Sequence, residues 1–454
     1  MVGIAVYAGA SRTLNQRRHP SAAIAWVLGI LLVPYLVLPL YLAFGSRKVT
    51  ASRTLPEARP VSISATSAYP TMLRSLQLGA AMGLPDPVSY DELSIHADGA
   101  QALDALRRVI SGAAVSLDVS TFLIGRDVLG REILRLLEQR ARAGVRVRLL
   151  IDGIGIYLGG YPNLRKLARA GVEIVRFVPP FSSSKRGRTN LRNHRKMVIA
   201  DGKRLWCGGR NLAAEYFEGD SRRFFRRAPW IDLSFDLSGE LVAEAYGQFE
   251  RDWAFASEKE APTNIGAAVR GAAGAMPALA QLVDSGPDRP DDTIFTLLVS
   301  ACFTSRQRIL AVTPYFVPEP SLLVALMLAA RRGIEVDLVI PVRSNHRLAD
   351  FARHRALRDM VAAGARVWLH PRMVHAKAVL VDDELALVGS ANLDGRSLFL
   401  NYEMMIAFYD RRAVADFAHW VEARRAECAP YLARHPGRAR EVAEGLLLWL
   451  AFQL

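Results

Sequence analysis

The sequence contains few cysteines, and its acidic residues are fewer than its basic ones. Three cysteines lie far apart without the spacing of a metal site, and an odd number cannot all pair, so we expect unpaired core thiols at Cys207, Cys302 and Cys428. The 44 acidic residues face 58 lysines and arginines, which gives a formal charge of +14. This balance indicates an anionic partner, either nucleic acid or an anionic membrane surface. A chain of 454 residues also exceeds one ordinary core, so two domains are expected.

Charge is absent from one long apolar run, residues 22–44. Its 23 positions suffice to cross a hydrocarbon core of about 30 Å at a rise of about 1.5 Å per residue. The run predicts one transmembrane helix within an N-terminal anchor at residues 1–48, and a buried core helix is the alternative. Pro34 and Pro39 predict a kink, with a re-entrant loop as a second reading. Basic residues flank both ends in similar number and leave the orientation open.

The rest of the chain contains an internal duplication with a period of 181 residues, the interval from His194 to His375. Each half reads as helix, strand, helix, strand, because apolar residues recur with the helical period and short Val, Ile and Leu runs alternate with them. The pattern predicts an α/β fold with two similar domains about a pseudo-twofold axis. The expected divisions are a linker at 49–85, a first domain at 86–260, a linker at 261–292, a second domain at 293–430 and an apolar segment at 431–454.

The repeated element places a histidine and a lysine at the mouth of a buried strand. The two copies read NHRKMVIAD from residue 193 and VHAKAVLVD from residue 374. Residues i and i+2 of a strand share a face, so the imidazole and the ammonium of each copy point the same way. The four residues are His194, Lys196, His375 and Lys377. One copy alone is more often a solvated strand edge, whereas two copies in duplicated context favour a functional site.

Each copy ends in an aspartate at a tight turn, Asp201 or Asp382. Seven residues separate this aspartate from its histidine, which is about 20 Å along a strand. It therefore cannot touch the same substrate atom, and we expect it to fix the turn. The returning strands, RLWCGGRN and ELALVGSAN, place Asn211 beside the first histidine and Asn392 beside the second.

These groups are suited to a phosphodiester substrate. A neutral imidazole is a nucleophile near neutral pH, and lysines and amides can neutralise phosphate oxygens as charge develops. A carboxylate would orient each imidazole; we expect Asp232 to serve His194 and Glu403 to serve His375, although either could be an ordinary surface carboxylate. No cofactor is expected, and no carboxylate cluster suggests a metal.

The chain resembles the phospholipase D superfamily with paired HKD motifs, and within it the bacterial cardiolipin synthases. The resemblance rests on the two motif strands, on SGPD at 285–288, on TPYFVPEP, on NYE after the second motif and on the N-terminal apolar segment. It implies two domains, each a mixed β-sheet flanked by helices. It also implies condensation of two phosphatidylglycerol molecules to cardiolipin and glycerol through a phosphatidyl-histidine. Carried over, His194 would be the nucleophile and His375 the general acid.

Two other enzymatic functions remain as alternatives. A hydrolytic phospholipase D, which releases phosphatidic acid, would use the same histidines. A nuclease fits the positive charge, but the apolar segment and the lack of a basic and aromatic track disfavour it, so no nucleic-acid partner is expected. A catalytically inactive membrane scaffold is disfavoured because both motifs are intact. We expect the inner membrane of a bacterium as the location and anionic phospholipid as the partner; the oligomeric state stays open.

Two further segments suggest membrane contact. Residues 221–230 read SRRFFRRAPW, which alternates arginines with aromatics and has no counterpart in the second half. We hypothesise that Phe224, Phe225 and Trp230 enter an anionic lipid surface; a solvated loop with its aromatics folded inward is the alternative. The basic stretch 182–192 adds charge just before His194. The C-terminal EGLLLWLAFQL could bind lipid in the same way or pack on the core.

Overall fold

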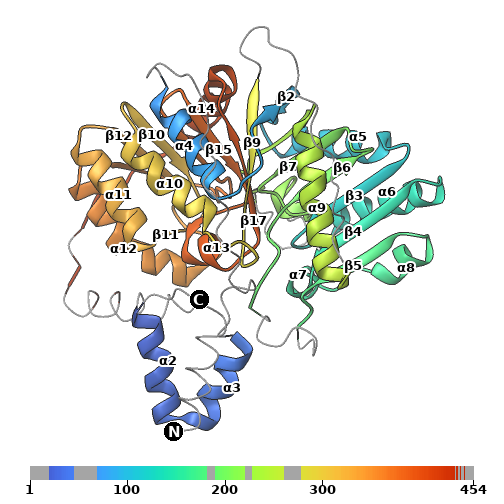
Figure 1. Cartoon of the computed structure of the whole chain (residues 1–454), viewed down its shortest axis with the longest axis horizontal. Helices are drawn as coiled ribbons and strands as arrows, with labels where there is room; N and C mark the ends of the chain where they lie inside the picture. Colours follow the sequence, from blue (N-terminus) through green and yellow to red (C-terminus); the bar gives the residue numbers. More distant parts are fainter. Residues whose placement is uncertain are drawn as a thin grey trace.

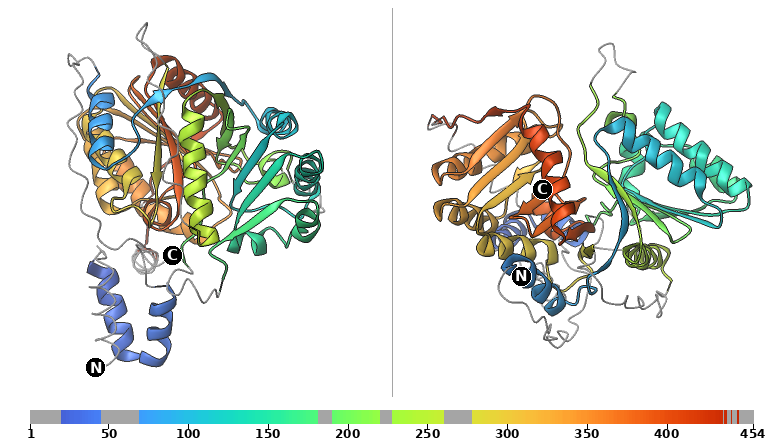
Figure 2. Two further views of the ribbon diagram at one scale, coloured as in Figure 1. Left: turned by 45° about the vertical axis from the view of Figure 1, so that its right-hand side comes forward. Right: turned by 90° about the horizontal axis from the view of Figure 1, so that it is seen from above.

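The computed structural model describes residues 20–44, 69–180, 190–219, 228–259 and 278–434, together with residues 436, 437, 440 and 444. Two α/β domains lie side by side, and a pair of short N-terminal helices lies below them in the view of Figure 1. Figure 2 shows the two domains from above, with helices on the outer side of each sheet. The predicted fold of two similar α/β domains is therefore confirmed.

The first sheet is mixed, since β3, β4 and β5 run parallel and the other four strands continue it in antiparallel pairs. In spatial order its strands are β2 (Asp91–Ile95), β8 (Ser234–Ser238), β7 (Arg204–Gly208), β6 (Met197–Ala200), β3 (Ser116–Thr121), β4 (Arg146–Asp152) and β5 (Glu173–Phe177). Its helices are α5 (Gly99–Gly112), α6 (Val128–Arg142), α7 (Gly153–Leu158), α8 (Leu164–Arg169), η2 (Ala214–Tyr216) and α9 (Leu241–Ser257). Asp98 and Asp127 cap α5 and α6 by accepting hydrogen bonds from backbone N–H groups of the first turn.

The second sheet has nine strands and follows the same plan. In spatial order they are β1 (Val88–Ser89), β9 (Leu279–Ser285), β17 (Glu403–Phe408), β15 (Leu385–Gly389), β14 (Ala378–Val381), β10 (Arg308–Val312), β12 (Glu335–Pro341), β13 (Arg366–His370) and β18 (Ala429–Pro430). Two short strands, β11 (Phe316–Val317) and β16 (Leu393–Asp394), pair separately. The helices are α4 (Pro70–Ala81), α10 (Thr293–Thr304), α11 (Pro320–Arg331), α12 (Arg347–Ala362), α13 (Gly395–Phe399) and α14 (Arg411–Arg425).

Strand order confirms the duplication. The series β8-β7-β6-β3-β4-β5 recurs as β17-β15-β14-β10-β12-β13, with the same parallel and antiparallel pairings. A central core of buried residues joins the two halves, with Phe235 and Phe249 from the first and Phe408 and Phe417 from the second. Because apolar burial is the main driving force of folding, this shared core fixes the two sheets against each other.

Both predicted linkers contain regular structure, so these boundaries were wrong in part. The expected linker at 261–292 contains β9, which hydrogen-bonds along β17, and the expected linker at 49–85 contains α4, which packs on α10. The short strand β1 belongs to the second sheet although it lies in the predicted first domain. The Ala-, Gly- and Pro-rich composition around β9 concealed its buried apolar residues.

The apolar run at 22–44 forms two short helices in place of one continuous helix. α2 (Pro20–Leu32) ends where Pro34 begins α3 (Pro34–Phe44), because proline has no N–H for an interior helical bond and is favoured in a first turn. The helices pack as a hairpin, with the rings of Trp26 and Tyr41 5.3 Å apart. The single transmembrane helix is thus not observed: in the described part of the chain, no helix has the length and apolar character needed to cross a membrane.

All three cysteines are free thiols. Cys207 and Cys302 are buried, as expected of core thiols, and Cys428 is half-buried. Burial raises the pKa of the Cys302 thiol to about 12, so it stays protonated at neutral pH.

Candidate active site

The two motif histidines lie where the halves meet. The backbone N–H of His194 donates to the carbonyl of Tyr402 at 2.9 Å, and that of His375 donates to the carbonyl of Ile231 at 2.6 Å. Each motif strand is thus hydrogen-bonded to a segment of the other half. The two hydrogen bonds are reciprocal, as a pseudo-twofold axis requires. Each histidine thus lies next to the residue that follows its backbone partner: Glu403 follows Tyr402, and Asp232 follows Ile231.

The carboxylates therefore serve the opposite histidines from those we predicted. Glu403 Oε1 lies 3.0 Å from His194 Nδ1, and Asp232 Oδ2 lies 2.7 Å from His375 Nδ1. Each carboxylate contacts a motif histidine, but the predicted pairing was wrong. The predicted pairing joins groups of the same domain, whereas the segments that carry these carboxylates reach a histidine of the other domain.

One difference between the motifs, GGRN in the first and GSAN in the second, follows from how each carboxylate is held. The hydroxyl of Ser390 donates to Glu403 Oε2, and the amide of Asn401 donates to Glu403 Oε1 at 3.2 Å. The position equivalent to Ser390 is Gly209, where a Cβ atom would lie 2.2 Å from Asp232 Oδ1. The shorter aspartate thus requires a glycine where the glutamate is held by a serine.

Both lysines are buried beside their histidines. Lys196 Nζ donates to the carbonyl of His194 at 2.6 Å, and Lys377 Nζ lies 2.6 Å from His375 Nδ1. Burial lowers the pKa of Lys196 to about 7 and that of Lys377 to about 8, against the opposing effect of Glu403 and Asp232. Lys377 of the second half also lowers the pKa of Lys196 in the first, so the two halves form one electrostatic site.

The pKa of each imidazole lies below its ordinary value, which favours the neutral form. Burial is the main cause that lowers the pKa of His194, and Glu403 opposes it. The pKa of His375 is lowered to about 3, by burial first and then by Lys377, while Asp232 opposes both. Although burial alone would raise it, the pKa of Asp232 lies below its ordinary value because Lys377 and His375 are adjacent. The carboxylates are thus ionised and ready to stabilise an imidazolium.

The asparagines lie close to the histidines in the register of the hairpins. Met197 pairs with Cys207, so continuing the register sets Asn211 opposite the residue before His194. The amide of Asn211 donates to the hydroxyl of Tyr216 at 2.8 Å. The Oδ1 atoms of Asn211 and Asn392 are buried without a hydrogen-bond partner among the described residues.

The motif aspartates lie at the far end of each hairpin. Asp201 accepts hydrogen bonds from the N–H groups of Ala114, Val115 and Ser116, at distances of 2.7 to 3.2 Å. Asp382 accepts the equivalent three bonds from residues 306–308. Both aspartates therefore hold the hairpin turn to the start of a neighbouring strand, away from the imidazoles.

The sequence did not predict the aromatic wall around the histidines. The ring of Phe122 lies 5.4 Å from that of His194. Around His375, ring centroids lie at 5.1 Å for Tyr216, 5.5 Å for Trp230 and 6.5 Å for Tyr315. Tyr315 stands in TPYFVPEP and Trp230 in SRRFFRRAPW, so these two segments were the available signals.

Trp230 faces the active site, so its predicted insertion into lipid was wrong. Its ring packs on Tyr216 and His375. Phe224 and Phe225, the basic residues 182–189 and most of the C-terminal segment 431–454 lie outside the described residues. Within the described ranges, no group of three or more His, Cys, Asp or Glu side chains is placed to hold a metal ion.

Comparison with protein families gives two matches. The family described as cardiolipin synthase, PLD-like domain, matches residues 106–253 and 298–425. A second family, described as phospholipase D-nuclease N-terminal, matches residues 4–46. The first match falls once in each half and covers both motif strands, which agrees with the duplicated fold.

Two curated relatives cover most of the chain. The chain is 31% identical to cardiolipin synthase A of Pseudomonas putida (strain W619) over 421 residues, which is 89% of this chain and 85% of the relative. It is 31% identical to cardiolipin synthase A of Pseudomonas aeruginosa (strain LESB58) over 445 residues, which is 94% of this chain and 89% of the relative.

One solved structure shares the fold over nearly its whole length. The crystal structure of phosphatidylserine synthase from Haemophilus influenzae Rd KW20 superposes with a TM-score of 0.63 at 14% identity. The alignment covers 84% of this chain and 98% of that chain. At this identity the likeness concerns the fold alone.

Proposed function

We propose a reaction for this chain from the premise that it belongs to the cardiolipin synthase family of phospholipase D-like proteins. The chain is a phosphatidyltransferase that condenses two phosphatidylglycerol molecules to cardiolipin and glycerol. The pair of crossed histidine–carboxylate contacts carries this proposal. Two imidazoles, each with its own ionised carboxylate, supply one nucleophile and one acid–base group for the same phosphodiester.

In the first step, the free ring nitrogen of His194 attacks phosphorus. The bond from phosphorus to the glycerol oxygen of the donor breaks, and His375, which enters this step as an imidazolium stabilised by Asp232 and the bound phosphodiester anion, protonates the departing alkoxide. In the second step, the hydroxyl of another phosphatidylglycerol attacks the phosphatidyl-histidine, its proton passes to His375, and His194 is released. Lys196 and Lys377 neutralise the phosphate oxygens as their charge grows, and Asn211 and Asn392 bind them.

The remaining residues hold this machinery in place. Glu403 and Asp232 orient the imidazoles and stabilise the imidazolium forms. Asp201 and Asp382 serve the reaction indirectly, because they hold the turns of the two motif hairpins.

We further propose that the enzyme works at a bacterial inner membrane, where its lipid substrates are. The hairpin of α2 and α3 supports this, because it exposes apolar side chains around its turn, including Leu32 at 79% and Tyr35 at 96% exposure. A monomeric soluble surface rarely carries such a contiguous apolar patch.

The test is incubation of the purified full-length protein with phosphatidylglycerol alone. Cardiolipin and glycerol in equal amounts are expected, and both should disappear with His194→Ala and with His375→Ala. Phosphatidic acid as the only product would instead establish the hydrolytic alternative. Full turnover by either alanine variant would contradict the assignment of two catalytic histidines.

A further inference from the structure

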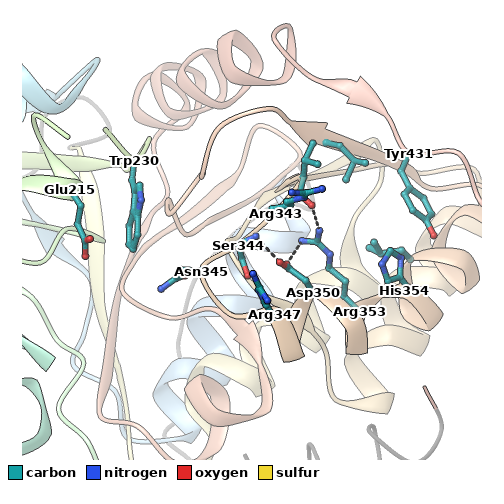
Figure 3. Close-up of a pocket in the computed structure, with 13 residues that line it drawn as sticks. Glu215, Trp230, Arg343, Ser344, Asn345, Arg347, Asp350, Arg353, His354 and Tyr431 are labelled. Carbon is teal, nitrogen blue, oxygen red and sulfur yellow. Dashed lines mark hydrogen bonds and ion pairs between the residues drawn. The ribbon is translucent and has the colours of Figure 1, made fainter. Parts of the chain in front are cut away.

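A cavity of about 970 Å³ adjoins the active site on the His375 side. Figure 3 shows Glu215 and Trp230 of the first half on one side of it, and Arg347, Arg353 and other residues of the second half on the opposite side. Its volume lies at the upper end of the range that accommodates small ligands, about 300–1,000 Å³. None of the catalytic groups assigned above lines this cavity.

Aromatic residues connect the cavity with the reacting groups. Trp230 lines the cavity, and its ring lies 5.5 Å from that of His375. On the other side, Asn345 lines the cavity and accepts a hydrogen bond from the hydroxyl of Tyr315, whose ring is 6.5 Å from His375. A molecule held in the cavity can therefore extend a short arm past Trp230 to His375.

The charge of the lining is suited to an anion. Three arginines, Arg343, Arg347 and Arg353, face two carboxylates, Glu215 and Asp350. Arg343 and Arg347 are exposed, and within the described part of the chain neither has an ion-pair partner. Asp350 is already engaged, since it accepts a hydrogen bond from the backbone N–H of Ser344 at 2.8 Å.

Arg353 is buried and forms an ion pair with Asp350, and it also has donors without a hydrogen-bond acceptor among the described residues. Its side chain is only 4% exposed, and its Nη2 donates to the carbonyl of Val342 at 2.7 Å. Its Nη1 lies 3.1 Å from Asp350 Oδ1 without the alignment of a hydrogen bond, and Nε has no hydrogen-bond partner among the described residues. An unsatisfied buried donor is costly, so these N–H groups are explained by a ligand that accepts from them.

Helix α12 adds to this positive potential. It begins at Arg347 on the cavity wall, and its N-cap residue, His346, makes no side-chain capping bond. The N-terminus of a 16-residue helix carries a partial positive charge and free N–H groups, which favour phosphate.

From these observations we propose that the cavity binds the phosphate group of the acceptor phosphatidylglycerol. The inference rests on the proposed function and adds the site of its second substrate. The two phosphates of the product are joined by one glycerol, which is the short arm that passes Trp230. Arg343, Arg347 and Arg353 hold the acceptor phosphate, and the free hydroxyl of its glycerol reaches His375.

This placement also assigns the roles of the histidines. The acceptor oxygen must attack phosphorus from the side opposite the phosphorus–nitrogen bond that breaks, and its proton must pass to the imidazole on the acceptor side. That imidazole is His375, so the phosphorus–nitrogen bond belongs to His194. The same His375 protonates the departing glycerol in the first step, because that glycerol leaves through the position that the acceptor then takes.

The test separates transfer to a lipid from transfer to free glycerol. Exchange of labelled glycerol into phosphatidylglycerol uses the same intermediate, but its acceptor has no phosphate. We expect Arg347→Glu and Arg343→Glu in the full-length enzyme to lower cardiolipin formation by about tenfold to a hundredfold, the value of a charge-assisted hydrogen bond. Glycerol exchange should stay within about twofold.

The matched control is Arg355→Glu, which reverses an exposed charge of the same helix outside the cavity. It should leave both reactions unchanged. Equal loss of cardiolipin formation and exchange in the cavity variants, or no loss of either, would overturn the acceptor site. Failure of the wild-type enzyme to form cardiolipin would overturn the proposed function itself, whatever the variants do.

Discussion

At the scale of single residues, the two active-site lysines titrate within the working range of most enzymes. Burial lowers the pKa of Lys196 to about 7 and that of Lys377 to about 8. Each ammonium is lost as the pH rises through its pKa, and the anionic substrate then loses a partner. kcat/KM reports the free enzyme, so we expect it to decrease as the pH rises from about 7 to about 8.

Bound phosphodiester stabilises the ammonium form, so the decline of kcat should lie at higher pH than that of kcat/KM. Lys196→Arg replaces the ammonium with a guanidinium, which does not deprotonate. The activity that this variant retains should therefore no longer decline near pH 7, the part of the decline that belongs to Lys196. A wild-type kcat/KM that stays flat above both pKa values would contradict this assignment.

Asp232 is predicted to set the protonation of His375. Its carboxylate, 2.7 Å from Nδ1, raises the pKa of the imidazole against the effects of burial and Lys377. Asp232→Asn removes that charge at nearly constant shape, so less His375 is protonated at a given pH. We expect kcat to fall by about 10²–10⁴-fold and the pH optimum to move to lower pH.

The shift in optimum separates positioning from general damage. Glu403→Gln alters the partner of the nucleophile, His194. It should reduce the rate but leave the pH optimum where it is in the wild type, because the pKa of His375 depends on Asp232. An unchanged optimum in Asp232→Asn, with a reduced rate, would show that Asp232 only supports the fold.

At the scale of elements, the turn of each motif hairpin depends on its aspartate. Asp201 has a left-handed φ of 53° and accepts three backbone N–H groups. Asn tolerates this conformation and keeps one oxygen, whereas Ala does neither. We expect Asp201→Ala to lower the free energy of unfolding by about 1–3 kcal/mol and Asp201→Asn to lower it less, as measured by denaturant unfolding.

The same bonds predict a dependence of stability on pH. The N–H groups hold the pKa of Asp201 below its ordinary value, although partial burial opposes them. This contribution is present above the unfolded-state pKa and is lost as the pH falls through the folded-state pKa. Wild type and Asp201→Ala should therefore converge in stability in acid; a constant difference would contradict the mechanism.

The sequence predicted the elements that repeat and missed those that depend on the other half. His194 and His375 were recognisable because strand period and duplication coincide. The pairing of Glu403 with His194 was not, because no local pattern shows that a segment crosses to the other domain. The break at Pro34 was read only as a kink, since a long apolar run favours one continuous helix.

At the scale of the whole molecule, Arg195 ties the two halves together. Fully buried between His194 and Lys196, it forms an ion pair with Asp252 of the first half. Its Nε donates to the carbonyl of Glu403 at 3.0 Å and its Nη2 to the carbonyl of Ser285 at 3.1 Å, both in the second half. The second motif has alanine at this position, Ala376, so it has no equivalent of this arginine.

Arg195→Met should destabilise the protein by about 3–5 kcal/mol, because it leaves the Asp252 carboxylate buried without its partner. The double variant Arg195→Met/Asp252→Asn should regain part of this stability in denaturant unfolding. Glycerol exchange should stay low in both variants, since Glu403 loses its anchor. If exchange recovers together with stability, Arg195 has no positioning role.

The N-terminal hairpin determines how this rigid catalytic body meets its lipid substrates. Leu32 and Tyr35, at the turn between α2 and α3, are the natural points of insertion because their side chains pack on little else. Burial of a large apolar side chain contributes about 1.5–3 kcal/mol, so Leu32→Glu/Tyr35→Glu should weaken binding to phosphatidylglycerol vesicles by at least about a hundredfold in flotation assays.

The control Val128→Glu replaces an exposed valine of α6 and should bind like wild type. Because the hairpin lies apart from the histidines, turnover of detergent-dispersed lipid should be equal in all three proteins; unchanged vesicle binding in the hairpin variant would mean that another surface holds the enzyme at the membrane.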